Sequence, residues 1–214
     1  MANSDKALRK LVEAIVEGDS DAVSRLLEAS PELARARFQE GATRQAEKPF
    51  FLDRIRRYIW RDDTALHIAA AGYQAETVRR LISERADIRA RNRHGDEPLH
   101  AAAVGAPGSP NWNPARQKET LVALIEAGAD PNCVNKSGVT PLHRAVRTRC
   151  AAAVRVLLER GADPERGNKN GSTPMVLARM NTGRGGSGSP EAKAQQQEII
   201  QLLEERVYGR RPAQ

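Results

Sequence analysis

Histidine is the residue type whose spacing in this chain first suggests chemistry. His67 and His100 are 33 positions apart, and His143 follows His100 by 43. Neutral imidazole binds zinc well, and three histidines suffice for a catalytic zinc site when each ring nitrogen lies about 2 Å from the ion. The metal hypothesis therefore depends on whether the fold brings together rings that are this far apart in sequence.

The cysteines and serines offer little for nucleophilic chemistry. The only two cysteines, Cys133 and Cys150, are predicted to lie in a loop and at the start of a helix, and two cysteines form no disulfide framework. The sequence supports no arrangement of a nucleophile beside a base. We expect a protein that is not an enzyme, holds no metal or cofactor, and lies in a reducing cytoplasm.

A glycine-rich segment, residues 181–190, satisfies the pattern G-x-G-x-x-G at Gly183, Gly185 and Gly188. The dinucleotide fingerprint needs a preceding strand, whereas a helix is expected here, and Ser189 stands where a phosphate loop of the Walker type requires lysine. Two interpretations stay open. The segment is a flexible linker, or its residues 183–189 with Arg184 bind a small anion or nucleotide where they open onto a helix N-terminus.

The basic balance of the chain permits several partners. Lys and Arg number 34 against 27 Asp and Glu, a formal charge of +7 that is spread along the sequence. Charge-driven nucleic-acid binding is permitted but not indicated. No apolar run is long enough to cross a bilayer, and the first residues lack the basic and apolar segments of a signal peptide. We expect a soluble, unsecreted protein with no membrane partner.

Internal repeats supply the elements that position these residues. Four related tetrapeptides recur: Thr64-Ala65-Leu66-His67, Glu97-Pro98-Leu99-His100, Thr140-Pro141-Leu142-His143 and Thr173-Pro174-Met175-Val176. The first two and the last two are each 33 positions apart, whereas the middle two are 43 apart. A fixed period with one longer step indicates a repeat array that carries an insertion.

Two further signatures follow the tetrapeptides. Apolar residues at positions i, i+3 and i+4 form one stripe on a helix: Val23/Leu26/Leu27, Val78/Leu81/Ile82, Leu121/Leu124/Ile125, Val154/Leu157/Leu158 and Ile199/Leu202/Leu203. Three of these helices end in a related tripeptide: Arg85-Ala86-Asp87, Gly128-Ala129-Asp130 and Gly161-Ala162-Asp163. Glycine there supplies the left-handed turn after a helix.

Over residues 62–207 these signatures resemble the ankyrin-repeat family, with departures at Ala65, Arg85, Glu97 and Met175-Val176. The resemblance implies an all-α solenoid of stacked helix–turn–helix units whose connecting loops project as β-hairpin fingers. We divide the chain into a capping helical pair (1–30), an extended finger insertion (31–61), a repeat (62–95), a repeat with an interhelical insertion (96–138), a repeat (139–171) and a C-terminal capping repeat with the glycine-rich insertion (172–214).

The resemblance also implies a role for the three histidines. In the family the histidine of this motif is structural and ties neighbouring loops by hydrogen bonds. Stacked repeats would hold His67, His100 and His143 too far apart to share one ion. We therefore reject the metal site.

The first finger is longer than the others. From the end of each apolar stripe to the next tetrapeptide the distance is 15 positions in three cases, but it is 37 from Leu27 to Thr64. The extra residues include Pro49 to Arg61, which we interpret as a short amphipathic helix with Phe51, Ile55, Tyr58 and Ile59 on one side and Arg54, Arg57 and Arg61 on the other. This helix covers the end of the core, or it walls the concave groove and presents Arg and Tyr.

A second insertion, residues 105–114, contains Trp112 and ends at Asn113-Pro114, a predicted cap and first position of a helix. Trp112 anchors a partner or packs back onto the scaffold. With Arg147, Arg149 and Arg184 it would form one patch on the edge that carries both interhelical insertions.

The resemblance implies binding through the concave face, and so we expect a monomeric cytoplasmic scaffold for a protein partner, preferably one with an acidic or phosphorylated segment. The candidate partner-binding residues are Arg54, Arg57, Tyr58, Arg91, Arg93, His94, Trp112, Lys136, Arg147, Arg149, Lys169 and Arg184.

Overall fold

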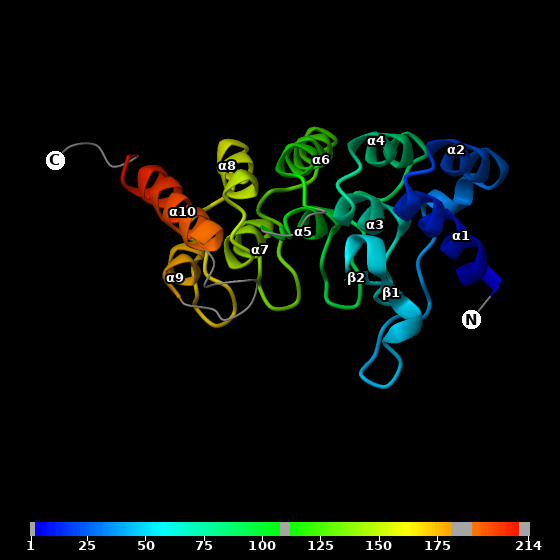
Figure 1. Cartoon of the computed structure of the whole chain (residues 1–214), viewed down its shortest axis with the longest axis horizontal. Coiled ribbons are helices and arrows are strands. Elements are labelled where there is room, and N and C mark those ends of the chain that lie inside the picture. Colours follow the sequence, from blue (N-terminus) through cyan, green and yellow to red (C-terminus); the bar gives the residue numbers. More distant parts are fainter. Residues whose placement is uncertain (1–2, 108–111, 181–189, 210–214) are drawn as a thin grey trace.

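Two rows of short helices run side by side along the length of the protein (Figure 1). The computed structural model describes residues 3–107, 112–180 and 190–209. The inner row consists of α1 (Asn3–Glu17), α3 (Ala65–Ala71), α5 (Pro98–Ala102), α7 (Pro141–Arg147) and α9 (Pro174–Arg179). The outer row consists of α2 (Ser20–Ala29), α4 (Ala75–Ser83), α6 (Pro114–Glu126), α8 (Ala151–Glu159) and α10 (Pro190–Tyr208). Each inner helix is followed along the chain by an outer one, which confirms the predicted repeat solenoid.

The tetrapeptides set where inner helices begin. Thr64, Thr140 and Thr173 each accept a hydrogen bond from the backbone N–H three residues later. Proline follows Thr140 and Thr173, and its missing N–H costs nothing in a first helical turn. Threonine and proline together therefore fix the first turn of the inner helices.

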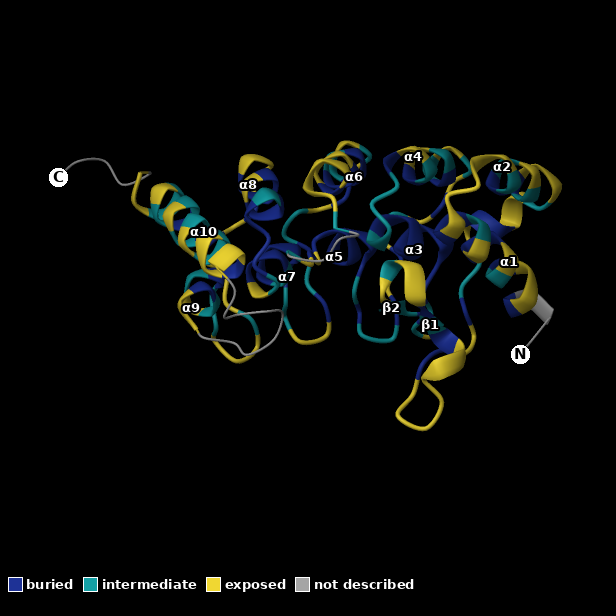
Figure 2. Ribbon diagram, in the orientation of Figure 1, coloured by how far each residue is buried: buried dark blue, intermediate teal, exposed yellow. Residues whose placement is uncertain are grey.

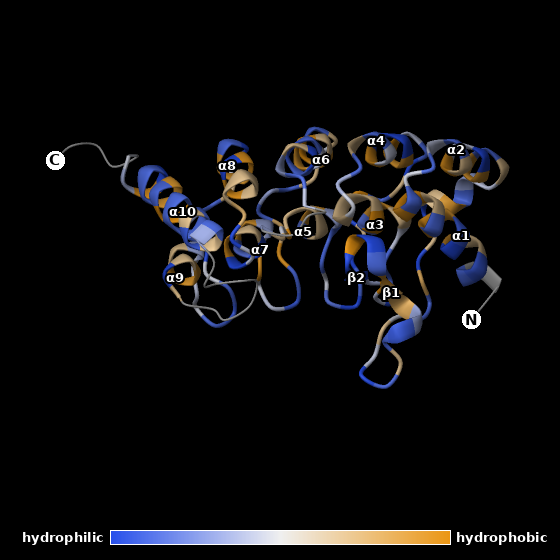
Figure 3. Cartoon of the chain, viewed as in Figure 1, coloured by the Kyte–Doolittle hydropathy of each residue, from blue (hydrophilic) through white to orange (hydrophobic). Residues whose placement is uncertain are grey.

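The apolar side chains of neighbouring helix pairs merge into one core. Leu66, Leu99 and Leu142 of the tetrapeptides and Leu81, Leu124 and Leu157 of the outer stripes are all 0% exposed. A connected cluster extends from Leu8 to Leu203, and the buried, hydrophobic sides of the two rows face each other (Figures 2 and 3). No described helix has both the length and the apolarity needed to cross a membrane.

The outer helices α4, α6 and α8 are followed by a left-handed residue, as the tripeptide signature predicts. Gly128 and Gly161 have φ of 104° and 89°, and Arg85 adopts the same region with φ of 62°. Glycine enters this region without steric cost, whereas a residue with a Cβ does not. Arg85 is exposed, and so the strain at this position is not offset by burial of its side chain.

Successive fingers are joined to one another through their backbones. We define finger one as residues 30–64, finger two as 84–97, finger three as 127–140 and finger four as 160–173. The links are Arg93 N to Arg61 O at 2.8 Å, Lys136 N to His94 O at 3.1 Å, and Lys169 N to Ser137 O at 3.0 Å. Fingers two to four are tight turns without assigned strands, and each is fixed against its neighbour.

The prediction of an amphipathic helix at residues 49–61 was wrong. The segment forms short 3₁₀ turns η2 (Lys48–Phe50) and η3 (Asp53–Ile55) and a hairpin of β1 (Phe51–Leu52) and β2 (Arg57–Tyr58), in which Phe51 pairs with Tyr58. The side chains of residues 50–52 and 58–60 alternate between two faces, a period of two that a helix cannot produce. Arg56 has φ of 49° and reverses the chain between the strands. Phe50, Leu52 and Ile59 are buried, so the hairpin covers part of the core.

The two interhelical insertions fall partly or wholly outside the described residues. Asn113 accepts a hydrogen bond from Arg116 N and caps α6, with Pro114 in the first turn, as predicted. The glycine-rich residues 181–189, with Arg184, lie outside the described residues.

Replacing Arg85 by glycine should raise the free energy of unfolding by about 0.5 kcal/mol. Relief of the left-handed strain, about 1 kcal/mol, exceeds the extra backbone freedom that glycine gives the unfolded chain. Urea unfolding followed by circular dichroism measures the change.

Gly161→Ala is the matched control, since φ is 89° and a Cβ there meets no atom within 4 Å. It should lower the stability. A less stable Arg85→Gly protein would show that backbone strain does not limit this helix end.

Candidate functional site

Three buried histidines tie the inner helices α3, α5 and α7 to the next finger. His67 Nε2 donates to Asp96 O, His100 Nε2 to Val139 O and His143 Nε2 to Ser172 O, each at 2.9 Å. In each ring Nδ1 accepts the N–H of the residue three positions earlier, at 3.1–3.2 Å. Both ring nitrogens are therefore engaged within the scaffold, and the structural role implied by the resemblance is what the geometry shows.

Burial keeps these histidines and the two cysteines uncharged. It lowers the pKa of His67 and His143, and it lowers that of His100 to about 4. The free thiols Cys133 and Cys150 are buried, and burial raises the pKa of both, to about 12 for Cys150. Protonated thiols are weak nucleophiles. The three histidines and two cysteines therefore act as structural residues of the buried interior.

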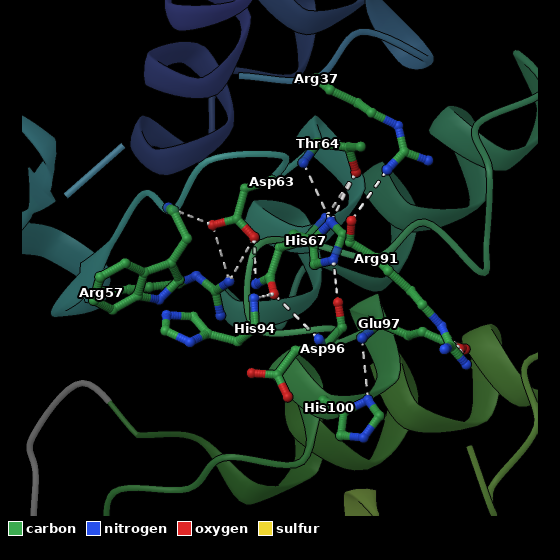
Figure 4. Close-up of polar contacts among 12 residues, drawn as sticks. Arg37, Arg57, Asp63, Thr64, His67, Arg91, His94, Asp96, Glu97 and His100 are labelled. Carbon is green, nitrogen blue, oxygen red and sulfur yellow. Dashed lines mark hydrogen bonds and ion pairs between the residues drawn. The ribbon is translucent and has the colours of Figure 1, made fainter. Parts of the chain in front are cut away.

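A buried carboxylate, Asp63, organises the base of finger one (Figure 4). It is 0% exposed and accepts bonds from Arg57 Nη2 at 3.2 Å, Trp60 N at 2.8 Å and Asn92 Nδ2 at 2.9 Å. The Arg57 guanidinium supplies the compensating charge that a buried carboxylate needs. Asp63 therefore links the inserted hairpin to finger two.

Asp96 repeats this arrangement one finger further on. Its carboxylate accepts bonds from Asn135 Nδ2 and Arg144 Nη2, both at 2.8 Å. Burial alone would raise the pKa of Asp96, but the Arg144 charge and the hydrogen bonds from Asn135 and Arg144 outweigh burial and lower it. Asn92 and Asn135 connect each carboxylate to the backbone of the following finger, because the side-chain oxygen of each asparagine accepts two backbone N–H groups of its own finger.

Four aromatic rings line the outward face of the hairpin and continue to finger two. The ring centroids of Phe51 and Tyr58 are 4.8 Å apart, those of Tyr58 and Trp60 5.6 Å, and those of Trp60 and His94 4.8 Å. The Arg93 guanidinium lies 5.4 Å from the Trp60 ring centroid, a cation–π contact. All five side chains are half-buried, and we call Phe51, Tyr58, Trp60 and His94 the ring stripe.

Arg93 also borders an open cleft of about 580 Å³ beside the extended loop of finger one. Its Nη1 donates to Ala42 O at 2.7 Å. The cleft is lined by Gln39, Glu40, Gly41, Thr43, Ala46, Phe50, Arg61 and Arg93. The close pass of Gly41 over the Trp60–Arg61 backbone leaves no space for a Cβ, which would lie 2.2 Å from Arg61 N.

Several predicted partner-binding cations are engaged within the protein. Arg54 pairs with Glu17 of α1 at 2.6 Å, Arg57 with Asp63 as above, and Arg91 with Glu97 at 3.1 Å. Half-buried Arg57 and exposed Arg91 each pair with a buried carboxylate, so both contribute to the scaffold. Tyr58, Arg93 and His94 are brought together in one place.

The remaining predicted residues lie elsewhere. Arg147, Lys136 and Lys169 are exposed, and Lys136 Nζ donates to Arg93 O at 2.8 Å. Arg149 is only 4% exposed, contrary to the surface patch predicted for it. Its left-handed backbone, φ 55°, turns it toward α9 and α10, where it lines a narrow space with Leu177 and Gln196.

Trp112 packs back onto the scaffold. Its Nε1 donates to Gln117 Oε1 at 2.9 Å, and the ring lies against the core. Gln117 is 0% exposed and also donates to Ala102 O and accepts from Cys150 Sγ. The partner-anchor interpretation of Trp112 loses its basis, because the polar end of the indole is used internally.

The sequence reasoning missed Phe51, Trp60, Asp63 and Asp96 as a connected group. A signal was present, because asparagine recurs at Asn92, Asn135 and Asn168, four positions before Asp96, Val139 and Ser172.

Comparison with known families gives three matches. A model described as ankyrin repeats in three copies matches residues 11–110, one described as ankyrin repeats in many copies matches residues 124–178, and a single ankyrin repeat matches residues 94–136. No curated protein matches the chain. The matched residues reach from α1 to α9.

Replacing Asp63 by alanine should lower the free energy of unfolding by about 3 kcal/mol, because the Arg57 guanidinium and two buried N–H groups lose their acceptor. Chemical denaturation measures the loss. The control is Asp53→Ala at an exposed position of the same hairpin, which should change stability little; equal losses in both variants would refute the role assigned to Asp63.

Stability should fall as the pH drops below 6.5. The folded-state pKa of His67, His100 and His143 is lowered from 6.5, so the unfolded chain binds protons that the folded chain does not. The stabilising contribution is complete above 6.5 and is lost progressively toward about 4, where His100 protonates in the folded protein. Thermal midpoints at several pH values in this window test the sign, and a midpoint that rises on acidification would contradict it.

Proposed function

The chain belongs to the ankyrin-repeat family, and from this we infer that it is a non-enzymatic scaffold that binds another protein along its fingers and inner helices. Ankyrin repeats are generally protein–protein interaction modules. The repeat stack supports such a role because it presents one long, rigid face whose loops are already ordered.

The observation that carries the proposal is a row of cations at equivalent positions of three consecutive fingers. Arg93, Lys136 and Lys169 each follow the finger asparagine directly, and the backbone N–H of each donates to the preceding finger. Lys136 and Lys169 are exposed. We call these three residues the finger cations.

Two finger carboxylates, Asp63 and Asp96, do not neutralise the charge of this row. Asp63 and Asp96 have side-chain exposures of 0% and 15% and already accept bonds from protein donors. These two finger carboxylates are therefore not available to neutralise the cations. This favours a partner with an acidic or phosphorylated segment.

The groups best suited to chemistry support a non-enzymatic role. The imidazoles of His67, His100 and His143 hold fingers, and both thiols are buried with raised pKa values. Each of these side chains contributes to the scaffold through burial or hydrogen bonding.

Affinity capture from a nuclease-treated native lysate tests the proposal. The bait variant Lys136→Glu/Lys169→Glu should lose the proteins that the unaltered chain retains, because charge reversal at the finger cations repels an acidic segment.

The matched control reverses two exposed cations of the outer row, Arg25→Glu/Lys118→Glu, and should retain those proteins. Identical sets for all three baits would exclude binding through the fingers. Material that is captured only without nuclease, with affinity falling steeply as salt rises, would favour nucleic acid instead.

A further inference from the structure

The ring stripe belongs to the insertion that distinguishes finger one from the other fingers. Phe51, Tyr58 and Trp60 lie on one face of the ribbon, while Phe50, Leu52 and Ile59 on the opposite face are at most 7% exposed. The buried face explains why the hairpin is attached to the core. Tyr58 and Trp60 also contact the core cluster over part of their surface, but all three rings are only half-buried, so each keeps an accessible portion that a partner can reach.

Rings and cation are held in place before any partner arrives. Tyr58 lies between Phe51 and Trp60, and the Trp60 ring meets the His94 edge and the Arg93 guanidinium. Asp63 fixes the backbone of Trp60 through the bond from Trp60 N. A surface whose side chains are already ordered loses little conformational entropy on binding.

The residue types of this surface are those that dominate binding energies at protein interfaces. Tyr, Trp and Arg are enriched among interface residues whose truncation costs most. Two cations stand at one end of the stripe, because Arg93 contacts Trp60 and Lys136 Nζ donates to Arg93 O. The Asp63 and Asp96 carboxylates beneath them are paired within the protein.

We propose that the ring stripe is an anchor site for an extended, acidic segment of a protein partner. An apolar or aromatic side chain of that segment packs on Tyr58 and Trp60, and its carboxylates contact Arg93 and Lys136. The proposal rests on the proposed function and deepens it, because it assigns the anchor to the inserted hairpin and not to the repeats in general.

Selection from a library of displayed short random peptides, with the full chain as target, tests the chemistry of the segment. The enriched peptides should carry an excess of Asp and Glu together with an aromatic or aliphatic residue. Failure to enrich any peptide, or enrichment of peptides with no acidic excess, overturns the proposal.

Binding of a synthesised, enriched peptide to variants then locates the site. Tyr58→Ala should weaken the affinity measured by fluorescence anisotropy by about tenfold, which corresponds to about 1.4 kcal/mol. The control Tyr73→Phe, which alters a tyrosine in the turn between α3 and α4, should leave the affinity unchanged. Equal affinity for Tyr58→Ala and the unaltered chain overturns the proposal.

A fluorescence measurement on an intact stripe guards against a folding defect in Tyr58→Ala. The chain has two tryptophans, so Trp112→Phe leaves Trp60 as the single indole, and its emission should shift when the peptide binds. In Trp60→Phe the remaining Trp112 emission should stay constant. An unchanged Trp60 emission at saturation overturns the proposal.

The outcomes separate this proposal from the proposed function. Peptides that lose binding to Lys136→Glu/Lys169→Glu but bind Tyr58→Ala normally place the partner on the finger cations alone, so the scaffold role stands and the anchor assignment fails.

Discussion

A hydrogen bond from a buried imidazole to the carbonyl of the next finger is the interaction on which the rest of this structure depends. The bond recurs at 2.9 Å from His67, His100 and His143. It joins the start of an inner helix, which belongs to the apolar stack, to a loop that projects from it. Because each ring is neutral and buried, an unmade bond would leave a polar atom in the core, and this penalty keeps stack and fingers in register.

The polar links between the fingers build on that register. Asp63 and Asp96 receive the amides of Asn92 and Asn135 from the following finger, and arginine supplies the compensating charge in both places. In these bonds the Asp63 and Asp96 carboxylates are paired within the protein. Arg93, Lys136 and Lys169 lie along the fingers, and of these Lys136 and Lys169 remain exposed.

The insertion in finger one is also held by a buried carboxylate, Asp63, but it adds a surface of aromatic rings. Asp63 holds Arg57 and the backbone of Trp60, the alternating residues bury Phe50, Leu52 and Ile59, and the rings between them are left on the outward face. The insertion is thereby fixed to the repeats and adds a surface that the other fingers lack.

The sequence by itself determined the repeats, the helix caps, the joining histidines and the left-handed helix ends, because each is a local requirement that recurs at a fixed period. Thr64, Thr140 and Gly161 could be interpreted position by position for that reason. Only the tertiary structure decided the hairpin at residues 51–58, the inward packing of Trp112 and the burial of Arg149. These depend on contacts between residues distant in sequence, such as the Trp60 ring with His94, or the Cys150 thiol with Gln117, which in turn holds the Trp112 indole. An insertion that occurs once has no period from which to infer them.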